Sequence, residues 1–149
     1  MKIILFQPDI AGNLGAVMRS AACYGVPLEV IEPCGFPLTA KALRRTAMDY
    51  GTTDQLTRHA SWDAFAAQKP AGRLVLLTTQ GATPLPDFQF QPDDRLLFGR
   101  ESAGVPEDVH AAAEARIIIP IAKDARSFNL ATSVAIAAYE ALRQTGGLP

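Results

Sequence analysis

Residues 117–130 read IIIPIAKDARSFNL, and this segment predicts a strand, a polar bend and the start of a helix. The isoleucine run favours a strand, because β-branched side chains pack well on a pleated surface. Asn129 stands where a helix N-cap is expected, and Gly146-Gly147 ends a helix that runs from about Asn129 to Arg143. Free backbone N–H groups at the helix start make the bend a candidate ligand cradle, although a simply capped helix explains the pattern equally well.

The same alternation of apolar runs and helical spacing extends outward to the rest of the chain. Strands are predicted at Lys2–Phe6, Leu28–Ile31, Arg73–Thr79, Arg95–Phe98 and Arg116–Ile119. Helices are predicted from Asn13 to Gly25, from Thr39 to Met48 and from Ser61 to Gln68, each with its first residue as the N-cap. A further helix is predicted to begin at Pro106. Strands interleaved with helices indicate an α/β fold with an open, mostly parallel sheet.

Ligands of such sheets bind in the loops that follow the carboxyl ends of the strands. The loops with unusual residues here follow Phe6, Leu77, Phe98 and Ile119. We therefore expect the functional site where these loops meet.

Composition indicates one globular domain and excludes several other classes. The chain has 149 residues, of which 48% are hydrophobic and 19% are charged, so a sizeable core is available and wholesale disorder is not expected. No apolar run approaches the ~20 residues that cross a bilayer, and no signal-peptide core is present, so a cytoplasmic protein is expected. Cys23 and Cys34 are expected to be ordinary buried or half-buried thiols. His59 and His110 make no ligand spacing, so no metal site is predicted.

The formal charge of −1 does not by itself announce nucleic-acid binding. Positive charge is concentrated at Arg44-Arg45 with Lys41 before it, and over Lys123 to Arg126. For both groups, the alternative to RNA binding is a helix face that is simply exposed to solvent.

Two further segments carry unusual glycines. Residues 13–19 read NLGAVMR, in which Gly15 costs about 1 kcal/mol relative to alanine in a helix and so suggests close approach by a ligand or another backbone. Residues 96–106 read LLFGRESAGVP, in which two glycines allow positive φ and close backbone approach. Neither segment is the GxGxxG fingerprint of dinucleotide-binding proteins.

Together and in this order, the three segments resemble the signature motifs of the SPOUT RNA methyltransferases: NxGxxxR, FGxExxGxP and IPxxxxxRSxNL. Within that superfamily the chain is similar to the small tRNA (cytidine/uridine-34)-2′-O-methyltransferases of the TrmL or YibK type. Further matches are Ile31-Glu32-Pro33 with Gly35-Phe36, Leu43-Arg44-Arg45 with Asp49-Tyr50, and Leu77-Thr78-Thr79 with Gly81. The resemblance spans residues 1 to 145, and we expect a single domain over 1–149 without a separate RNA-binding domain.

The resemblance implies a parallel-sheet SPOUT (α/β knot) fold with a C-terminal trefoil knot, a homodimer, and S-adenosylmethionine as cofactor. General rules of chain topology do not predict a knot. The residues that the resemblance assigns to the cofactor, largely through backbone groups, are Leu77, Thr78, Thr79, Gly99, Glu101, Ile119, Ile121, Ser127, Phe128 and Leu130.

The reaction implied is methylation of the ribose 2′-OH of the wobble nucleotide of tRNA. A hydroxyl is a poor nucleophile until its proton is taken, yet no histidine or paired carboxylate stands in the three loops. The resemblance assigns catalysis to Arg19, Ser127 and Asn129. Because a guanidinium stays protonated, we interpret Arg19 as a group that binds phosphate or polarises the hydroxyl. The residues implied for RNA binding are Asn13, Arg19, Lys41, Arg44, Arg45 and Arg126.

Four positions depart from the pattern of the relatives: Ala11, Gly12 and Arg100 stand where prolines are common, and Ala131 where serine is frequent. These departures leave open the same chemistry on another tRNA nucleotide or on rRNA. A non-catalytic module that binds RNA or the cofactor is the second alternative, and a generic α/β nucleotide-binding protein the third.

Overall fold

The computed structural model describes residues 1–39, 56–81 and 83–149. Its strands form one sheet in the order β3-β2-β1-β6-β4-β7-β5, and every strand pair in it is parallel. The strands are β1 (Lys2–Phe6), β2 (Leu28–Ile31), β3 (Leu56–His59), β4 (Leu74–Leu77), β5 (Thr83–Pro84), β6 (Arg95–Phe98) and β7 (Ala115–Ile118). The helices are α1 (Ala11–Tyr24), α3 (Trp62–Ala66), α4 (Glu107–Ala112) and α5 (Leu130–Thr145), with a 3₁₀ turn η2 (Leu85–Asp87). The α/β fold and the parallel sheet predicted from the sequence are confirmed.

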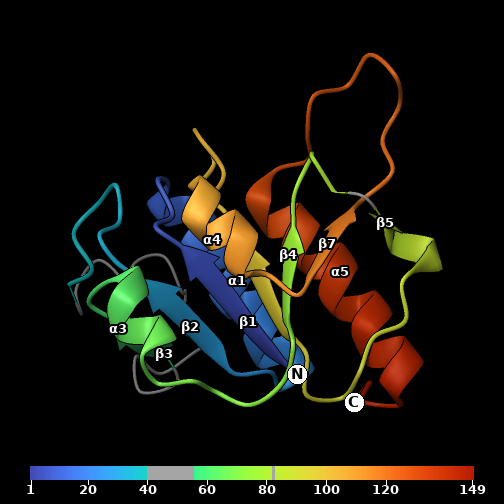
Figure 1. The fold of residues 1–149 in the computed structure, drawn as a ribbon, viewed down its shortest axis with the longest axis horizontal. Helices are drawn as coiled ribbons and strands as arrows, with labels where there is room; N and C mark the ends of the chain where they lie inside the picture. Colours follow the sequence, from blue (N-terminus) through green and yellow to red (C-terminus); the bar gives the residue numbers. More distant parts are fainter. Residues whose placement is uncertain (40–55, 82) are drawn as a thin grey trace.

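Helices cover both faces of the sheet, as the unbroken apolar strands require (Figure 1). Along β1, Ile3 and Leu5 pack into a core shared with α1 and α5, whereas Ile4 and Phe6 pack into a second core with α3 and α4. This division follows from the strand itself, because successive side chains point to opposite faces.

The predicted strands over Lys2–Phe6, Leu28–Ile31 and Arg95–Phe98 have the predicted bounds. Ser61 and Asn129 are N-caps as expected: Ser61 accepts from the backbone N–H of Ala64, and Asn129 accepts from two N–H groups of α5. The helix after Ser61 ends at Ala66 and is shorter than predicted. Of the helix predicted from Thr39 through Met48, only Thr39 lies within the described residues.

Two strands were not predicted. β3 reads LTRH and has two exposed central residues, so it lacks the apolar run that indicates a strand. It pairs on one side, with β2, in the register Leu28 to Leu56. β5 has two residues and includes a proline, which is tolerated there because β5 is the last strand of the sheet order.

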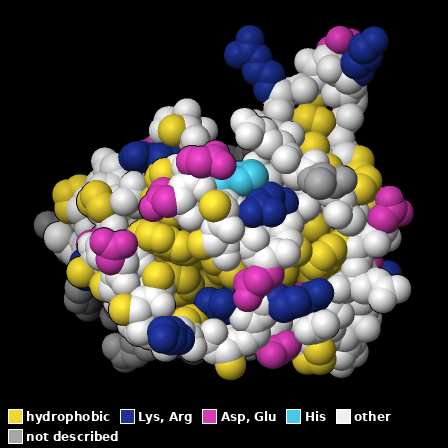
Figure 2. Space-filling view, viewed as in Figure 1, with side chains coloured by type: hydrophobic (Ala, Val, Ile, Leu, Met, Phe, Trp, Pro, Cys, Tyr) yellow, Lys and Arg dark blue, Asp and Glu magenta, His cyan; other side chains and the backbone are white. Residues whose placement is uncertain are grey.

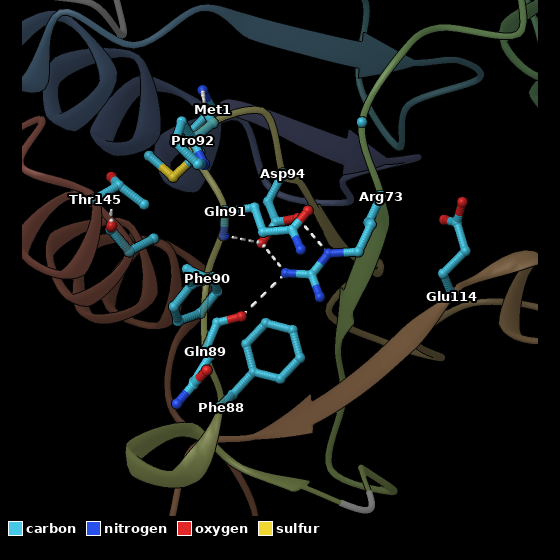
Figure 3. Close-up of polar contacts among 12 residues, drawn as sticks. Met1, Arg73, Phe88, Gln89, Phe90, Gln91, Pro92, Asp94, Glu114 and Thr145 are labelled. Carbon is cyan, nitrogen blue, oxygen red and sulfur yellow. Dashed lines mark hydrogen bonds and ion pairs between the residues drawn. The ribbon is translucent and has the colours of Figure 1, made fainter.

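An ion pair between a half-buried arginine and a fully buried aspartate joins the amino ends of β4 and β6. The register pairs Leu74 with Arg95, so the residues before them, Arg73 and Asp94, lie side by side. Arg73 donates to both carboxylate oxygens of Asp94 at 2.8 Å, and the side chain of Asp94 is fully buried (Figure 3). The Arg73 guanidinium also lies 5.2 Å from the centroid of the Phe88 ring. This end of the sheet is the opposite one from the loops where a ligand is expected.

Both cysteines are free thiols. Cys23 is exposed, so the expectation that it is buried or half-buried is wrong; Cys34 is half-buried, and burial raises the pKa of its thiol to about 11. None of the described helices is both long and apolar enough to span a bilayer.

Candidate active site

A cavity of about 800 Å³ lies at the carboxyl ends of the central strands. Its wall combines the loops after β4, β6 and β7, the start of α5 and the first turn of α1, which are far apart in the sequence. Every residue that the motifs assigned to the cofactor lines it: Leu77, Thr78, Thr79, Gly99, Glu101, Ile119, Ile121, Ser127, Phe128 and Leu130. Asn13, Arg126 and Asn129 line it as well.

The loop after β4 is held against β7 by backbone contacts. The N–H of Thr78 donates to the carbonyl of Ile117 at 3.0 Å. A Cβ placed on Gly81 would lie 2.5 Å from the carbonyl carbon of Ile117, so only glycine fits this close approach. Backbone contacts with β7 therefore set the position of this loop, of which Thr78, Thr79 and Gln80 line the cavity.

The turn Gly99–Gly104 forms the next part of the wall. Arg100 and Gly104 exchange two backbone hydrogen bonds of 3.0 and 2.9 Å. Gly104 has a φ of +67°, and a Cβ on Gly99 would lie 2.5 Å from the carbonyl carbon of Gly104. Positive φ and close backbone approach, both expected of this glycine pair, are confirmed.

Asp9 connects this turn to the loop after β1 through hydrogen bonds. Its carboxylate accepts from the Arg100 guanidinium at 2.7 Å, and from the Ser102 hydroxyl and backbone N–H at 2.6 and 3.0 Å. In return, the backbone N–H of Asp9 donates to the Glu101 carboxylate at 2.7 Å. The hydrogen bonds from Arg100 and then Ser102 lower the pKa of Asp9 to about 2. Asp9 was not predicted as a site residue, since an isolated aspartate after a strand reads as an ordinary loop residue.

A row of side-chain hydrogen bonds connects the three motif segments. Asn13 donates to the Glu101 carboxylate at 2.9 Å and accepts from the Asn129 amide at 2.9 Å. The prediction that Asn13 is the N-cap of the first helix is wrong, because α1 starts at Ala11 after Ile10 and Asn13 lies inside its first turn. The Asn13 side chain is instead turned towards Glu101 and Asn129, in contacts that join residues about 90 and 116 positions apart.

The polar bend after β7 projects from the body of the molecule (Figure 1). Residues 122–129 are all exposed, and among them are Lys123 and Arg126. Figure 2 shows basic side chains at the upper end of this projection, with an acidic side chain beside one of them. The bend also carries the exposed Asp124, and of its two basic residues Arg126 lines the cavity.

Arg19 does not line the cavity. It lies on the exposed side of α1, off the apolar stripe of the helix as the sequence predicted. The remaining residues predicted to bind RNA, Lys41, Arg44 and Arg45, lie outside the described residues.

His110 lines the cavity and was not predicted as a site residue. The Nε–H of Arg116 donates to its Nδ1 at 3.1 Å, which leaves the proton of a neutral imidazole on Nε2. Nε2 is buried and has no hydrogen-bond partner among the described residues. No group of three or more metal-ligating side chains occurs in the described ranges.

Fold and cavity together define an α/β protein with a ligand site where parallel strands end. The chain matches the SpoU rRNA Methylase family over residues 1–139, and it belongs to that family.

Relatives with known names share most of its length. The tRNA (cytidine(34)-2′-O)-methyltransferase of Beijerinckia indica subsp. indica is 51% identical over 148 residues, which cover 98% of this chain and 92% of the relative. A structure solved under the description "Structural insights into the 2-OH methylation of C/U34 on tRNA" is 41% identical with a TM-score of 0.89, over 96% of this chain and 94% of that one. The SpoU methyltransferase AviRb from Streptomyces viridochromogenes, in complex with AdoMet, is 27% identical with a TM-score of 0.81, over 97% of this chain and 57% of that one.

Proposed function

We propose that this chain uses S-adenosylmethionine to methylate the ribose 2′-OH of nucleotide 34 of tRNA, a cytidine or a modified uridine. The observation that carries the proposal is the convergence of all three motif segments on one cavity. The names of the relatives support the same reaction, because the one that is 51% identical acts on cytidine 34 of tRNA.

The residues of the cavity fit this cofactor. The volume of about 800 Å³ lies in the range of ordinary small-molecule sites, about 300–1,000 Å³. Leu77, Ile119 and Ile121 supply apolar surface, and Thr78, Thr79 and Gly99 also line the cavity. The backbone of these residues is proposed to offer N–H and carbonyl groups to the cofactor. The cofactor supplies a methyl group that is electrophilic because it is bonded to a sulfonium sulfur.

The chain itself has to position the 2′-OH and ease the loss of its proton. Positioning alone can contribute ~7–11 kcal/mol to such a reaction. Ser127 and Asn129 are the proposed orienting groups, and Asn129 is held in place by Asn13. Arg19 is proposed to bind phosphate or polarise the hydroxyl, with proton loss to the phosphate or to water. Because Arg19 does not line the cavity of its own chain, the second role requires RNA binding or the predicted homodimer to bring it to the hydroxyl.

Lys41, Arg44, Arg45, Arg126 and Asn13 are the proposed RNA contacts. The exposed position of Arg126 beside the cavity supports its part in this proposal. A homodimer, the trefoil knot and a cytoplasmic location stay predictions. Light scattering is expected to give twice the monomer mass of 15.9 kDa.

The deciding experiment incubates the protein with methyl-labelled S-adenosylmethionine and tRNA from cells that lack the gene, then locates the methylated nucleoside by mass spectrometry. A 2′-O-methyl group at position 34 is the expected result. Arg19→Ala is expected to abolish it while the affinity for S-adenosylhomocysteine stays unchanged. Comparable turnover by this variant contradicts the role of Arg19.

The second candidate is the same chemistry on rRNA, which the name of the matched family favours. Ribosomal RNA from the same cells, tested in parallel, separates the two. Label confined to rRNA would replace the tRNA proposal but keep the reaction.

A further inference from the structure

Large hydrophobic side chains are exposed at four places among the described residues: Ile10 (51%), Phe128 (43%), Tyr139 (49%) and Leu148 (38%). Two of them, Ile10 and Phe128, line the cavity. Single exposed apolar residues are ordinary, but two on the wall of one ligand cavity indicate a surface that a ligand covers.

The segments that carry these two residues meet at Asn13. Ile10 lies one turn before Asn13, whose backbone N–H donates to the Ile10 carbonyl at 3.0 Å. Phe128 immediately precedes Asn129, whose amide donates to the Asn13 side chain at 2.9 Å. The hydrogen bond between Asn13 and Asn129 thus brings the loop after β1 and the end of the polar bend together.

Phe128 also lies between the two residues proposed to orient the 2′-OH, Ser127 and Asn129. In a nucleotide, the base is attached to the ring carbon next to the one that carries the 2′-OH. A ribose whose hydroxyl reaches Ser127 and Asn129 therefore brings its base close to this segment. The base needs a surface there, because it must leave its stacked neighbours to enter the cavity.

We propose that Phe128, flanked by Ile10, is the platform on which the base of the methylated nucleotide stacks; this inference rests on the function proposed above. The backbone of residue 128 belongs to the cofactor side of the wall, and its side chain serves the substrate. An aromatic face accepts any base, since every base has a π-face, so the platform suits both cytidine and modified uridine.

Charge around the platform fits a single-stranded RNA loop. Lys123 and Arg126 are exposed on the same bend that ends in Phe128. Proteins that bind unpaired nucleotides commonly combine basic side chains along the phosphates with aromatic side chains under the bases.

The test uses full-length tRNA with either cytidine or an abasic ribose at position 34, so that the 2′-OH is present in both. With normal tRNA, Phe128→Leu is expected to lower kcat/KM by about 5- to 150-fold, the range of a base–aromatic stack of about 1–3 kcal/mol at 1.36 kcal/mol per tenfold. With abasic tRNA, the wild type and Phe128→Leu are expected to react at the same reduced rate, because the stack is already lost.

Matched variants separate the aromatic face from general effects. Phe128→Tyr keeps the face and is expected to retain activity within about threefold of the wild type. Leu148→Ala removes an exposed apolar side chain away from the cavity and is expected to have no effect. Binding of S-adenosylhomocysteine is measured by calorimetry in all four proteins, and with Phe128→Leu it is expected to weaken far less than kcat/KM falls, because residue 128 is assigned to the cofactor through its backbone.

A fluorescent cytidine analogue at position 34 gives a readout that does not depend on turnover. The wild type is expected to quench it on binding, and Phe128→Leu is not. Equal losses on normal and abasic tRNA, or a matching loss of S-adenosylhomocysteine affinity, would overturn the platform while leaving the methylation in place. Quenching that depends on Phe128 without any methylation would instead uphold the platform and contradict the proposed reaction.

Discussion

Asp9 makes its contacts as a carboxylate. Hydrogen bonds from Arg100 and Ser102 lower its pKa from 3.8 to about 2. Because the pKa is lower in the folded state than in the unfolded one, the stabilisation is present above about pH 4 and is lost as the pH falls through about 2.

Titration of the Asp9 carboxyl by NMR is expected to show a midpoint near 2. Arg100→Gln removes the largest cause of the shift and is expected to move the midpoint towards 3.8. Arg143→Gln, which removes a guanidinium from the opposite end of the chain, is the control and leaves the midpoint unchanged. A midpoint that stays near 2 in Arg100→Gln contradicts the assignment of the shift to Arg100.

The Asn13 amide satisfies two neighbours at once, because it donates to Glu101 and accepts from Asn129. Asn13→Asp keeps the shape but places a second carboxylate about 2.9 Å from that of Glu101. The repulsion is expected to reduce the free energy of unfolding by about 1–3 kcal/mol at pH 8.

The loss is expected to shrink at pH 5, because a proton shared by the two carboxylates relieves the repulsion. Denaturant unfolding of the variant and the wild type at both pH values checks this. A pH-independent difference would show that the Asn13 amide is not directed at Glu101.

At the scale of elements, the loop after β4 is shaped by a backbone contact with β7. Gly81→Ala would place a Cβ 2.5 Å from the carbonyl carbon of Ile117, so the loop has to move. We expect the affinity for S-adenosylhomocysteine to fall at least about tenfold, because a shift of this wall misplaces the backbone groups that hold the ligand.

Gly12→Ala is the matched control. Its Cβ would meet nothing within 4 Å, and it lies in the first turn of α1. Alanine there is expected to raise the free energy of unfolding by up to about 1 kcal/mol and to leave ligand affinity unchanged. If the two variants bind S-adenosylhomocysteine with equal affinity, the loop after β4 is not part of the binding site.

For the whole molecule, the ion pair between Arg73 and Asp94 stabilises the end of the sheet opposite the cavity. Arg73→Met leaves the fully buried Asp94 carboxylate without its cation and is expected to cost about 3–5 kcal/mol of unfolding free energy. The exposed pair of Arg143 with Glu140 is the comparison, and Arg143→Met is expected to change stability little. Thermal and denaturant unfolding measure the stability of both variants. Similar losses of unfolding free energy would contradict the expectation that the pair with the buried carboxylate matters more than the exposed pair.

Local signals were sufficient for most of the elements. Lys2–Phe6 and Arg95–Phe98 are strands because their side chains can be buried on both faces, and Asn129 caps α5 through N–H groups two and three residues away. The motif residues of the cavity, such as Gly99 and Glu101, were predicted only through the resemblance, because related chains use the same motifs in their binding sites.

Contacts between distant residues were decided by the tertiary structure alone. The folded chain places β1 between β2 and β6, Asn13 between Glu101 and Asn129, and Asp9 beside Arg100. These contacts join segments that lie far apart in the sequence, so no local pattern predicts them. His110 was missed as a cavity residue for the same reason, whereas β3 was missed because it lacks an apolar run. The sequence by itself determined most of the strands and helices, because these depend on neighbours within a few residues, and it indicated the chemistry only through the resemblance. The folded sheet decided which side chains share the cavity, because that depends on strand order and register.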